Sequence, residues 1–107
     1  MGQSRKQISC PAEITLSVIT GRWKLLILQR LYVKVNRFGE LRRALRGISE
    51  KVLSEELRQL EGHGIIIRRA YAQVPLKVEY SITSLGRRLE SIVNAMHQWG
   101  TEYLDKM

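Results

Sequence analysis

Cysteine and histidine are the side chains of this 107-residue chain that could do nucleophilic or metal chemistry, and there are few of them. The chain has one cysteine, Cys10, and two histidines, His63 and His97. Neither histidine has a cysteine or carboxylate partner at metal-ligand spacing, so we expect no metal site. The phosphate-cradling G-x-x-x-x-G-K motif and the zinc motif H-E-x-x-H do not occur in the sequence. The sequence therefore predicts that the protein is not an enzyme and needs no cofactor.

Cys10 is the residue with the most reactive predicted surroundings. It precedes Pro11, a residue type that suits the first position of a helix, which places Cys10 at the N-cap. A helix N-terminus, with Arg5 and Lys6 nearby in sequence, favours the reactive thiolate. Cys10 is thus a candidate redox sensor, and the alternative is a small residue that only caps the helix. With one cysteine per chain, a disulfide must join two chains or join one chain to a small thiol.

Lysine and arginine dominate the charge of the chain. There are 18 of them against 10 Asp and Glu, a formal net charge of +8. Residues 22–77 hold 13 Lys or Arg and 5 Asp or Glu, so this segment carries the whole excess. Solubility alone does not require such localisation. A localised excess favours a polyanionic partner, either nucleic acid or an anionic membrane surface.

Length and composition predict one globular domain. The chain is 44% apolar with 2 Pro and 8 Gly. No run of apolar residues is long enough to span a membrane, and the polar start lacks the apolar stretch of a signal peptide. We therefore expect a cytoplasmic protein with no membrane partner, a frayed segment over residues 1–9 and a single domain over 10–107.

The elements that must position the basic residues follow from hydrophobic spacing. Helices are predicted from Pro11 to about Thr20 and over 22–33. A short helix then ends at Gly47, and Ser49 caps a further helix that ends near His63. Two helices joined by about four residues that include glycine are typical of a helix-turn-helix, here over about 37–63.

The second helix of this pair has one apolar and one polar face. Its leucines are spaced to face the core, and a polar face opposes them. We expect that face and the nearby cations to contact duplex DNA. The candidate base-edge contacts are Ser49, Lys51, Ser54 and Arg58. The candidate phosphate contacts are Arg37, Arg42, Arg43, Arg69 and Lys77.

Beyond this helix the pattern changes to strands and then to a last helix. Residues 65–72 and 78–83 are rich in β-branched side chains, which predicts a hairpin over about 65–83 with residues 73–77 as its loop. Such a hairpin is the wing of a winged helix.

Thr83 is expected to cap a continuous helix over about 84–104, whose apolar stripe either covers the core or forms a dimer. The candidate dimer residues are Ile14, Ile92, Met96, Trp99 and Tyr103. The aromatic residues Trp23, Trp99 and Tyr103 could also line a pocket for a small-molecule effector.

Several segments together resemble one family, the HxlR-type winged helix-turn-helix regulators. The matching segments are 10–11, 21–28, 37–43, 47–53, 57–61, 74–83, 85–86 and 99–100. The resemblance implies an α+β, mostly helical winged helix-turn-helix fold with flanking N- and C-terminal dimerisation helices. It also implies a homodimeric bacterial or archaeal transcription factor that binds double-stranded DNA. Its recognition helix would be residues 49–61, its wing residues 73–77, and Cys10 would stand where some members carry a sensor of oxidants or electrophiles.

Two carboxylates depart from this pattern. Glu50 and Glu55 stand where uncharged polar residues are expected, and carboxylates repel phosphates, although Glu accepts from the cytosine N4 amino group. The base preference therefore stays open. The alternative function is a protein-interaction adaptor or an RNA-binding module. The basic segment offers few aromatic stacking platforms, which counts against RNA.

Overall fold

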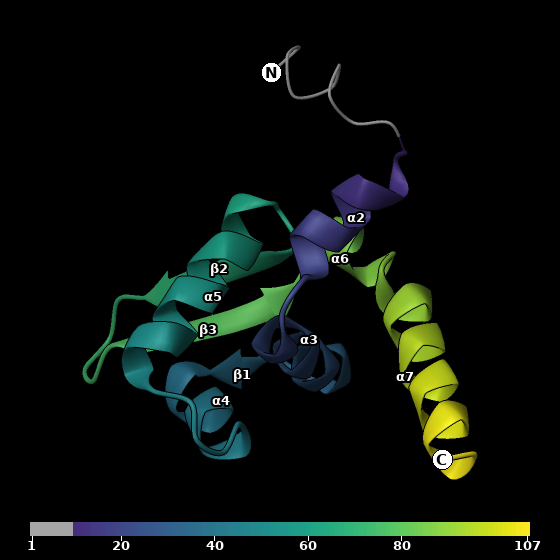
Figure 1. Cartoon of the computed structure of the whole chain (residues 1–107). Coiled ribbons are helices and arrows are strands. Elements are labelled where there is room, and N and C mark those ends of the chain that lie inside the picture. Colours follow the sequence, from purple (N-terminus) through teal and green to yellow (C-terminus); the bar gives the residue numbers. More distant parts are fainter. Residues whose placement is uncertain (1–9) are drawn as a thin grey trace.

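The structure is a computed structural model that describes residues 10–107 (Figure 1). The frayed segment expected over residues 1–9 lies outside the described residues. The elements are, in chain order, α2 (Ala12–Ile19), α3 (Arg22–Val33), β1 (Asn36–Arg37), α4 (Phe38–Ala44), α5 (Glu50–Gly62), β2 (Ile66–Tyr71), β3 (Lys77–Ile82), α6 (Ser84–Arg87) and α7 (Glu90–Asp105). The fold is the predicted winged helix-turn-helix, α+β and mostly helical.

Helix α2 begins one residue later than the sequence predicts. Pro11 is its N-cap, in helical backbone geometry, and makes no side-chain cap hydrogen bond. The expected N-cap, Cys10, lies one residue before the observed N-cap. Its carbonyl oxygen accepts the backbone N–H of Glu13 at 2.9 Å. Cys10 is therefore tied to the first turn by its backbone, and its side chain is exposed.

The helix-turn-helix itself forms from strong local signals. Gly47, at φ 90°, makes the turn between α4 and α5 in a backbone region that favours glycine. Ser49 accepts the N–H of Val52 at 3.1 Å and thereby caps α5, as predicted. Helix α5 ends at its C-cap His63, followed by Gly64 at φ 73°. The two glycines and the serine thus fix where α5 begins and ends.

The wing belongs to a three-stranded antiparallel sheet in the order β1-β3-β2. The predicted hairpin is present, with Ile66 opposite Ile82 at one end and Tyr71 opposite Lys77 at the other. Lys77 is the first residue of β3 and not part of the loop, because its backbone pairs with Tyr71. The short strand β1 was not predicted. Asn36 and Arg37 pair with Tyr80 and Glu79, so the backbone before α4 is extended.

One apolar core joins the helix-turn-helix to the sheet. Its most buried members come from α3, α4, α5, β2 and α7: Ile27, Leu28, Leu31, Leu41, Leu53, Leu57, Leu60, Ile66 and Val93. Each large aliphatic side chain buried in this way contributes about 1.5–3 kcal/mol. The three leucines of α5 thus hold that helix on the body and leave its opposite face to solvent.

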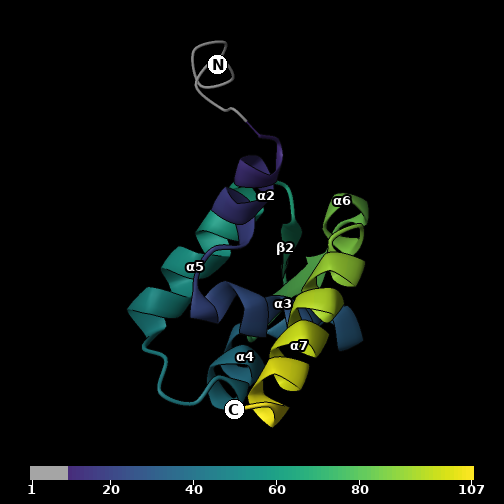
Figure 2. The same ribbon diagram turned by 45° about the vertical axis from the view of Figure 1, so that its right-hand side comes forward.

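The last helix is broken, contrary to the prediction of one helix over 84–104. Thr83 does cap the first piece by accepting the N–H of Gly86 at 3.0 Å. Backbone bonds from Arg88 to Leu85 and from Leu89 to Gly86 then span three residues, which tightens the turn and ends α6. Gly86 packs against the carbonyl oxygen of Ile65, where a β-carbon would lie only 2.1 Å away. Helix α7 starts after this turn and stands apart from the sheet (Figures 1 and 2).

Candidate nucleic-acid interface

Helix α5 presents the face on which most base-edge candidates lie. Lys51 and Arg58 are exposed on the side opposite the buried leucines, and Ser54 is half-buried at the edge of that side. Ser49 is exposed, and its hydroxyl oxygen is already engaged as the N-cap acceptor. The α5 face therefore offers two long cations, the Glu55 carboxylate between them and, at its edge, the Ser54 hydroxyl.

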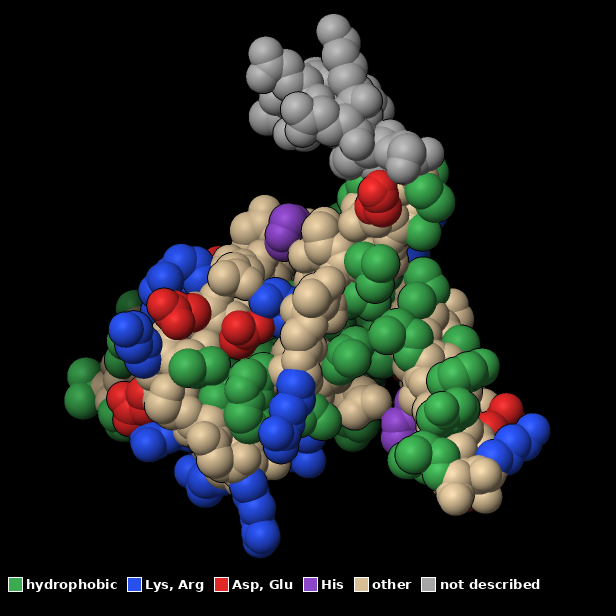
Figure 3. All heavy atoms as spheres, in the orientation of Figure 1, with side chains coloured by type: hydrophobic (Ala, Val, Ile, Leu, Met, Phe, Trp, Pro, Cys, Tyr) green, Lys and Arg blue, Asp and Glu red, His purple; other side chains and the backbone are tan. Residues whose placement is uncertain are grey.

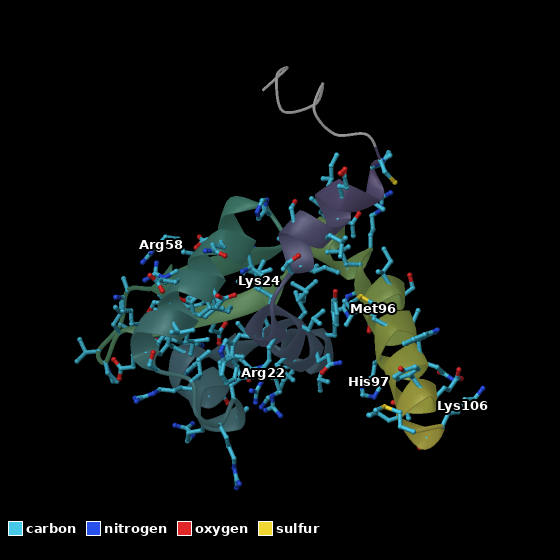
Figure 4. All side chains as sticks on the ribbon, in the orientation of Figure 1. Arg22, Lys24, Arg58, Met96, His97 and Lys106 are labelled. Carbon is cyan, nitrogen blue, oxygen red and sulfur yellow. The ribbon has the colours of Figure 1, made fainter. Side chains whose placement is uncertain are left out.

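A buried lysine that sequence reasoning missed holds α5 against α3. Lys24 is only 7% exposed. Its Nζ donates to Glu56 Oε1 at 2.7 Å and to Gln59 Oε1 at 2.5 Å, both on α5 (Figure 4). A buried ammonium is stable only with such acceptors. The sequence signal was weak: a lysine stands within an otherwise apolar helical stretch, and its partners are 32 and 35 residues away.

The phosphate candidates on α4 lie beside the start of α5. Arg42 is exposed, and its Nη1 lies 2.8 Å from Glu50 Oε2 in the first turn of α5. Arg43 is exposed on the same helix. Arg37 is exposed in β1, and its backbone N–H donates to Glu40 Oε1 at 2.7 Å. That hydrogen bond, with Lys34 nearby, holds the pKa of Glu40 below its usual range.

The wing carries the remaining two phosphate candidates, which differ in their exposure to solvent. Arg69 is exposed on β2, opposite Glu79 of β3. Lys77 is half-buried, because its Nζ lies 3.4 Å from Glu79 Oε2 and 4.8 Å from the centre of the Tyr71 ring. Lys77 must leave these intramolecular partners, at least in part, to bind a phosphate.

The structure brings the candidate cations into one part of the molecule. They come from β1, α4, α5 and the wing, which adjoin one another, whereas α7 bears few cations along its visible face (Figure 3). The same part of the chain carries the whole charge excess. Such clustering is the electrostatic footprint expected for a phosphate backbone.

The apolar stripe of α7 is mostly in contact with solvent. Val93 packs into the core, but Ile92 and Met96 are each 42% exposed, Trp99 is 65% exposed and Tyr103 is 53% exposed. Ile14 of α2, the remaining dimer candidate, is 47% exposed. Trp99 and Tyr103 stack with ring centres 5.1 Å apart. The core of one chain therefore does not account for this stripe.

A groove does lie between the winged part and α7, but the expected aromatic residues do not line it. It measures about 500 Å³. Its lining comes from facing strips of α3 and α7: Arg22, Leu25, Leu26, Gln29, Val93, Met96 and His97 (Figure 4). Trp23 packs against the core, and Trp99 and Tyr103 lie further along α7, beside Glu102 and Lys106, so the predicted aromatic lining is wrong.

The part of the chain that the structure describes offers little else for chemistry. Residues 10–107 contain no cluster of three His, Cys, Asp or Glu side chains that could hold a metal ion. His63 caps α5 with its backbone, and its side chain is exposed, as is that of His97. No helix within the same range has the length and apolar character needed to cross a membrane.

Comparison with known proteins identifies the family. The sequence model described as HxlR-like helix-turn-helix matches residues 18–107. The chain belongs to the HxlR-like helix-turn-helix family. This result confirms the resemblance drawn from the sequence and makes the chain a helix-turn-helix transcriptional regulator.

Individual relatives are also transcriptional or redox regulators by name. The uncharacterized HTH-type transcriptional regulator YdeP of Bacillus subtilis is 44% identical over 98 residues, which cover 92% of this chain and 77% of YdeP. The redox regulator HypR in its reduced form is 45% identical with a TM-score of 0.86, covering 90% of this chain and 95% of HypR. The reduced form of the transcriptional regulator YodB from B. subtilis is 31% identical with a TM-score of 0.81, covering 94% of this chain and 99% of YodB.

Proposed function

We propose that this HxlR-like regulator binds a specific site on double-stranded DNA through α5, with the wing on the phosphate backbone. The observation that carries the proposal is the polar face of α5, on which Lys51 and Arg58 are exposed. Three buried leucines and the Lys24 contacts to Glu56 and Gln59 hold this face outward. A helix of this kind reads base edges in the major groove, while flanking cations fix its register on the phosphates. Chromosomal DNA as the ligand also implies a cytoplasmic location.

The proposed DNA-binding form is a homodimer joined through α2 and α7. The exposed stripe of Ile92, Met96, Trp99 and Tyr103, with Ile14 of α2, supplies an apolar surface that a second copy would cover. A two-fold dimer would place two α5 helices in successive major grooves, about 34 Å apart. The operator would then be a pseudo-palindrome.

Selection from a random duplex library tests this function, followed by anisotropy titration of the winning sequence across salt. A two-fold symmetric site with a steep salt dependence is the expected result, because several phosphates release counterions on binding. Tight but sequence-blind binding would contradict base reading. The absence of duplex binding at low salt would instead favour the protein-adaptor or RNA-binding alternative.

We further propose that Cys10 makes this binding responsive to oxidants or electrophiles. Cys10 is exposed just before the first turn of α2, which is one of the two proposed dimer helices. The related HypR has been determined in reduced and oxidized forms, and YodB in reduced and diamide-treated forms. With one cysteine per chain, an oxidised Cys10 would pair with the Cys10 of a second chain or with a small thiol.

Labelling of the native protein by a thiol reagent at pH 6 and at pH 8 tests this sensor. A reactive Cys10 should be modified at both values, because the side chain is exposed to the reagent. The denatured protein gives the reference rate at each pH. Negligible modification of the native protein at both values would contradict the sensor role and leave Cys10 as a structural residue.

A further inference from the structure

Helix α5 carries four carboxylates, and the structure divides them into two pairs. Glu50 is bound to Arg42 of α4 at 2.8 Å, and Glu56 to Lys24 of α3 at 2.7 Å. Neighbouring helices therefore neutralise both. Glu55 and Glu61 are exposed, and within residues 10–107 no cation forms an ion pair with either of them. The second pair keeps its negative charge at the surface of a strongly basic segment.

Position along the helix separates the two free carboxylates. Glu55 lies in the middle of the polar face, one turn after Lys51 and one turn before Arg58. Glu61 stands in the last turn, about 9 Å further along the axis. Recognition helices contact base edges mainly with their N-terminal residues. On the proposed docking, Glu55 therefore lies inside the major groove and Glu61 lies beyond it.

The chemistry of the groove decides what a free carboxylate there can bind. Phosphates repel it, and it can only accept hydrogen bonds. Guanine and thymine present only acceptors or a methyl group, so they leave it unpaired. Adenine presents an N6 donor beside an N7 acceptor, which would repel the second carboxylate oxygen. Cytosine presents the N4 amino donor without an adjacent acceptor, and is therefore the base that suits a glutamate.

We propose that Glu55 selects cytosine at one position of each operator half-site, by accepting a hydrogen bond from its N4 amino group. Lys51 and Arg58 on either side supply donors that suit O6 and N7 of guanine, which fits a G·C-containing contact around that cytosine. This inference rests on the proposed DNA-binding function and adds to it the identity of a base. It also gives a role to Glu55, which stands where the family pattern has an uncharged polar residue.

The test compares the wild-type protein, Glu55→Gln and Glu61→Gln in the same selection from a random duplex library. Wild type should enrich a symmetric site with cytosine at one position per half-site. Glu55→Gln should replace that cytosine with adenine, because an amide bonds adenine N6 and N7 together. Titration of the paired duplexes should show each protein about tenfold tighter on its own base. Glu61→Gln removes the same charge and should still select cytosine.

Three outcomes are decisive. A cytosine-to-adenine switch confined to Glu55→Gln supports the inference. Identical base preferences for wild type and Glu55→Gln, both folded by circular dichroism, would overturn it and make Glu55 a solvated surface residue. Failure of the wild-type protein to enrich any site would overturn the proposed function, and the inference with it.

Discussion

Single side chains on α5 are expected to determine which bases this regulator binds. Arg58 is the candidate that is least restrained by contacts within the protein. It is exposed in the third turn of the helix, and no ion pair within the described residues holds it. Its guanidinium can therefore bind guanine in bidentate geometry without first leaving a partner.

We expect Arg58→Ala to weaken binding to the selected operator by about 1–3 kcal/mol. The reason is the loss of a bidentate base contact, so binding to a random duplex should change much less. Anisotropy titrations on both duplexes measure the difference. An equal loss on the two duplexes would assign Arg58 to a phosphate.

Lys77 differs from Arg58 because the structure already gives it partners. Its contacts with Glu79 and the Tyr71 ring hold the ammonium beside the wing. Lys77→Ala should weaken specific and random duplexes to a similar degree and reduce the salt slope by about 1. The slope is measured from binding constants across a salt series. If the slope does not change, Lys77 remains bound to Glu79 and does not contact the DNA.

At the scale of elements, the orientation of α5 depends on contacts that its own sequence does not contain. The leucines fix which side of α5 is buried, and the Lys24 hydrogen bonds to Glu56 and Gln59 fix its position against α3. A lysine buried to this degree makes the α3–α5 packing sensitive to a single charge.

Lys24→Met should lower the free energy of unfolding by about 2–3 kcal/mol, because it leaves Glu56 without its cation in a partly buried site. Breaking a fully buried ion pair costs about 3–5 kcal/mol. We expect a smaller loss here because the Glu56 side chain is 20% exposed, so water partly solvates its charge. Urea denaturation measures the loss. The double variant Lys24→Met/Glu56→Leu leaves no unpaired charge and should recover part of it. A double variant less stable than Lys24→Met would contradict this account.

At the scale of the whole molecule, the winged part and α7 differ in surface character. Cations gather on the former, and exposed apolar side chains gather on the latter (Figure 3). This separation suits one surface for DNA and another for a second copy of the chain.

We expect Trp99→Asp to give a folded monomer, because the substitution places a charge in the centre of the exposed stripe on α7. Sedimentation velocity measures the change, with Thr101→Asp as a control that adds the same charge on the exposed opposite side of the same helix. A folded Trp99→Asp variant that still sediments as a dimer would contradict the proposed interface.

The local elements of this protein could be predicted from the sequence. The N-cap Ser49, the turn glycines Gly47 and Gly64 and the leucine spacing of α5 act over a few residues, so they specify the helix-turn-helix directly. The hairpin was predictable for the same reason. The family follows from motifs spread along the chain, and the charge excess follows from counting.

Contacts between distant residues were decided by the tertiary structure alone. Strand β1 exists only because Asn36 and Arg37 pair with β3, and α6 packs on the sheet side only because Gly86 lies against the carbonyl oxygen of Ile65. Lys24 and Glu56 are 32 residues apart. The sequence determined which charges this protein has; folding determined which of them neutralise one another, because ion pairing depends on distances of a few ångströms that only packing sets. For that reason four equivalent glutamates in one helix become two bound and two free carboxylates.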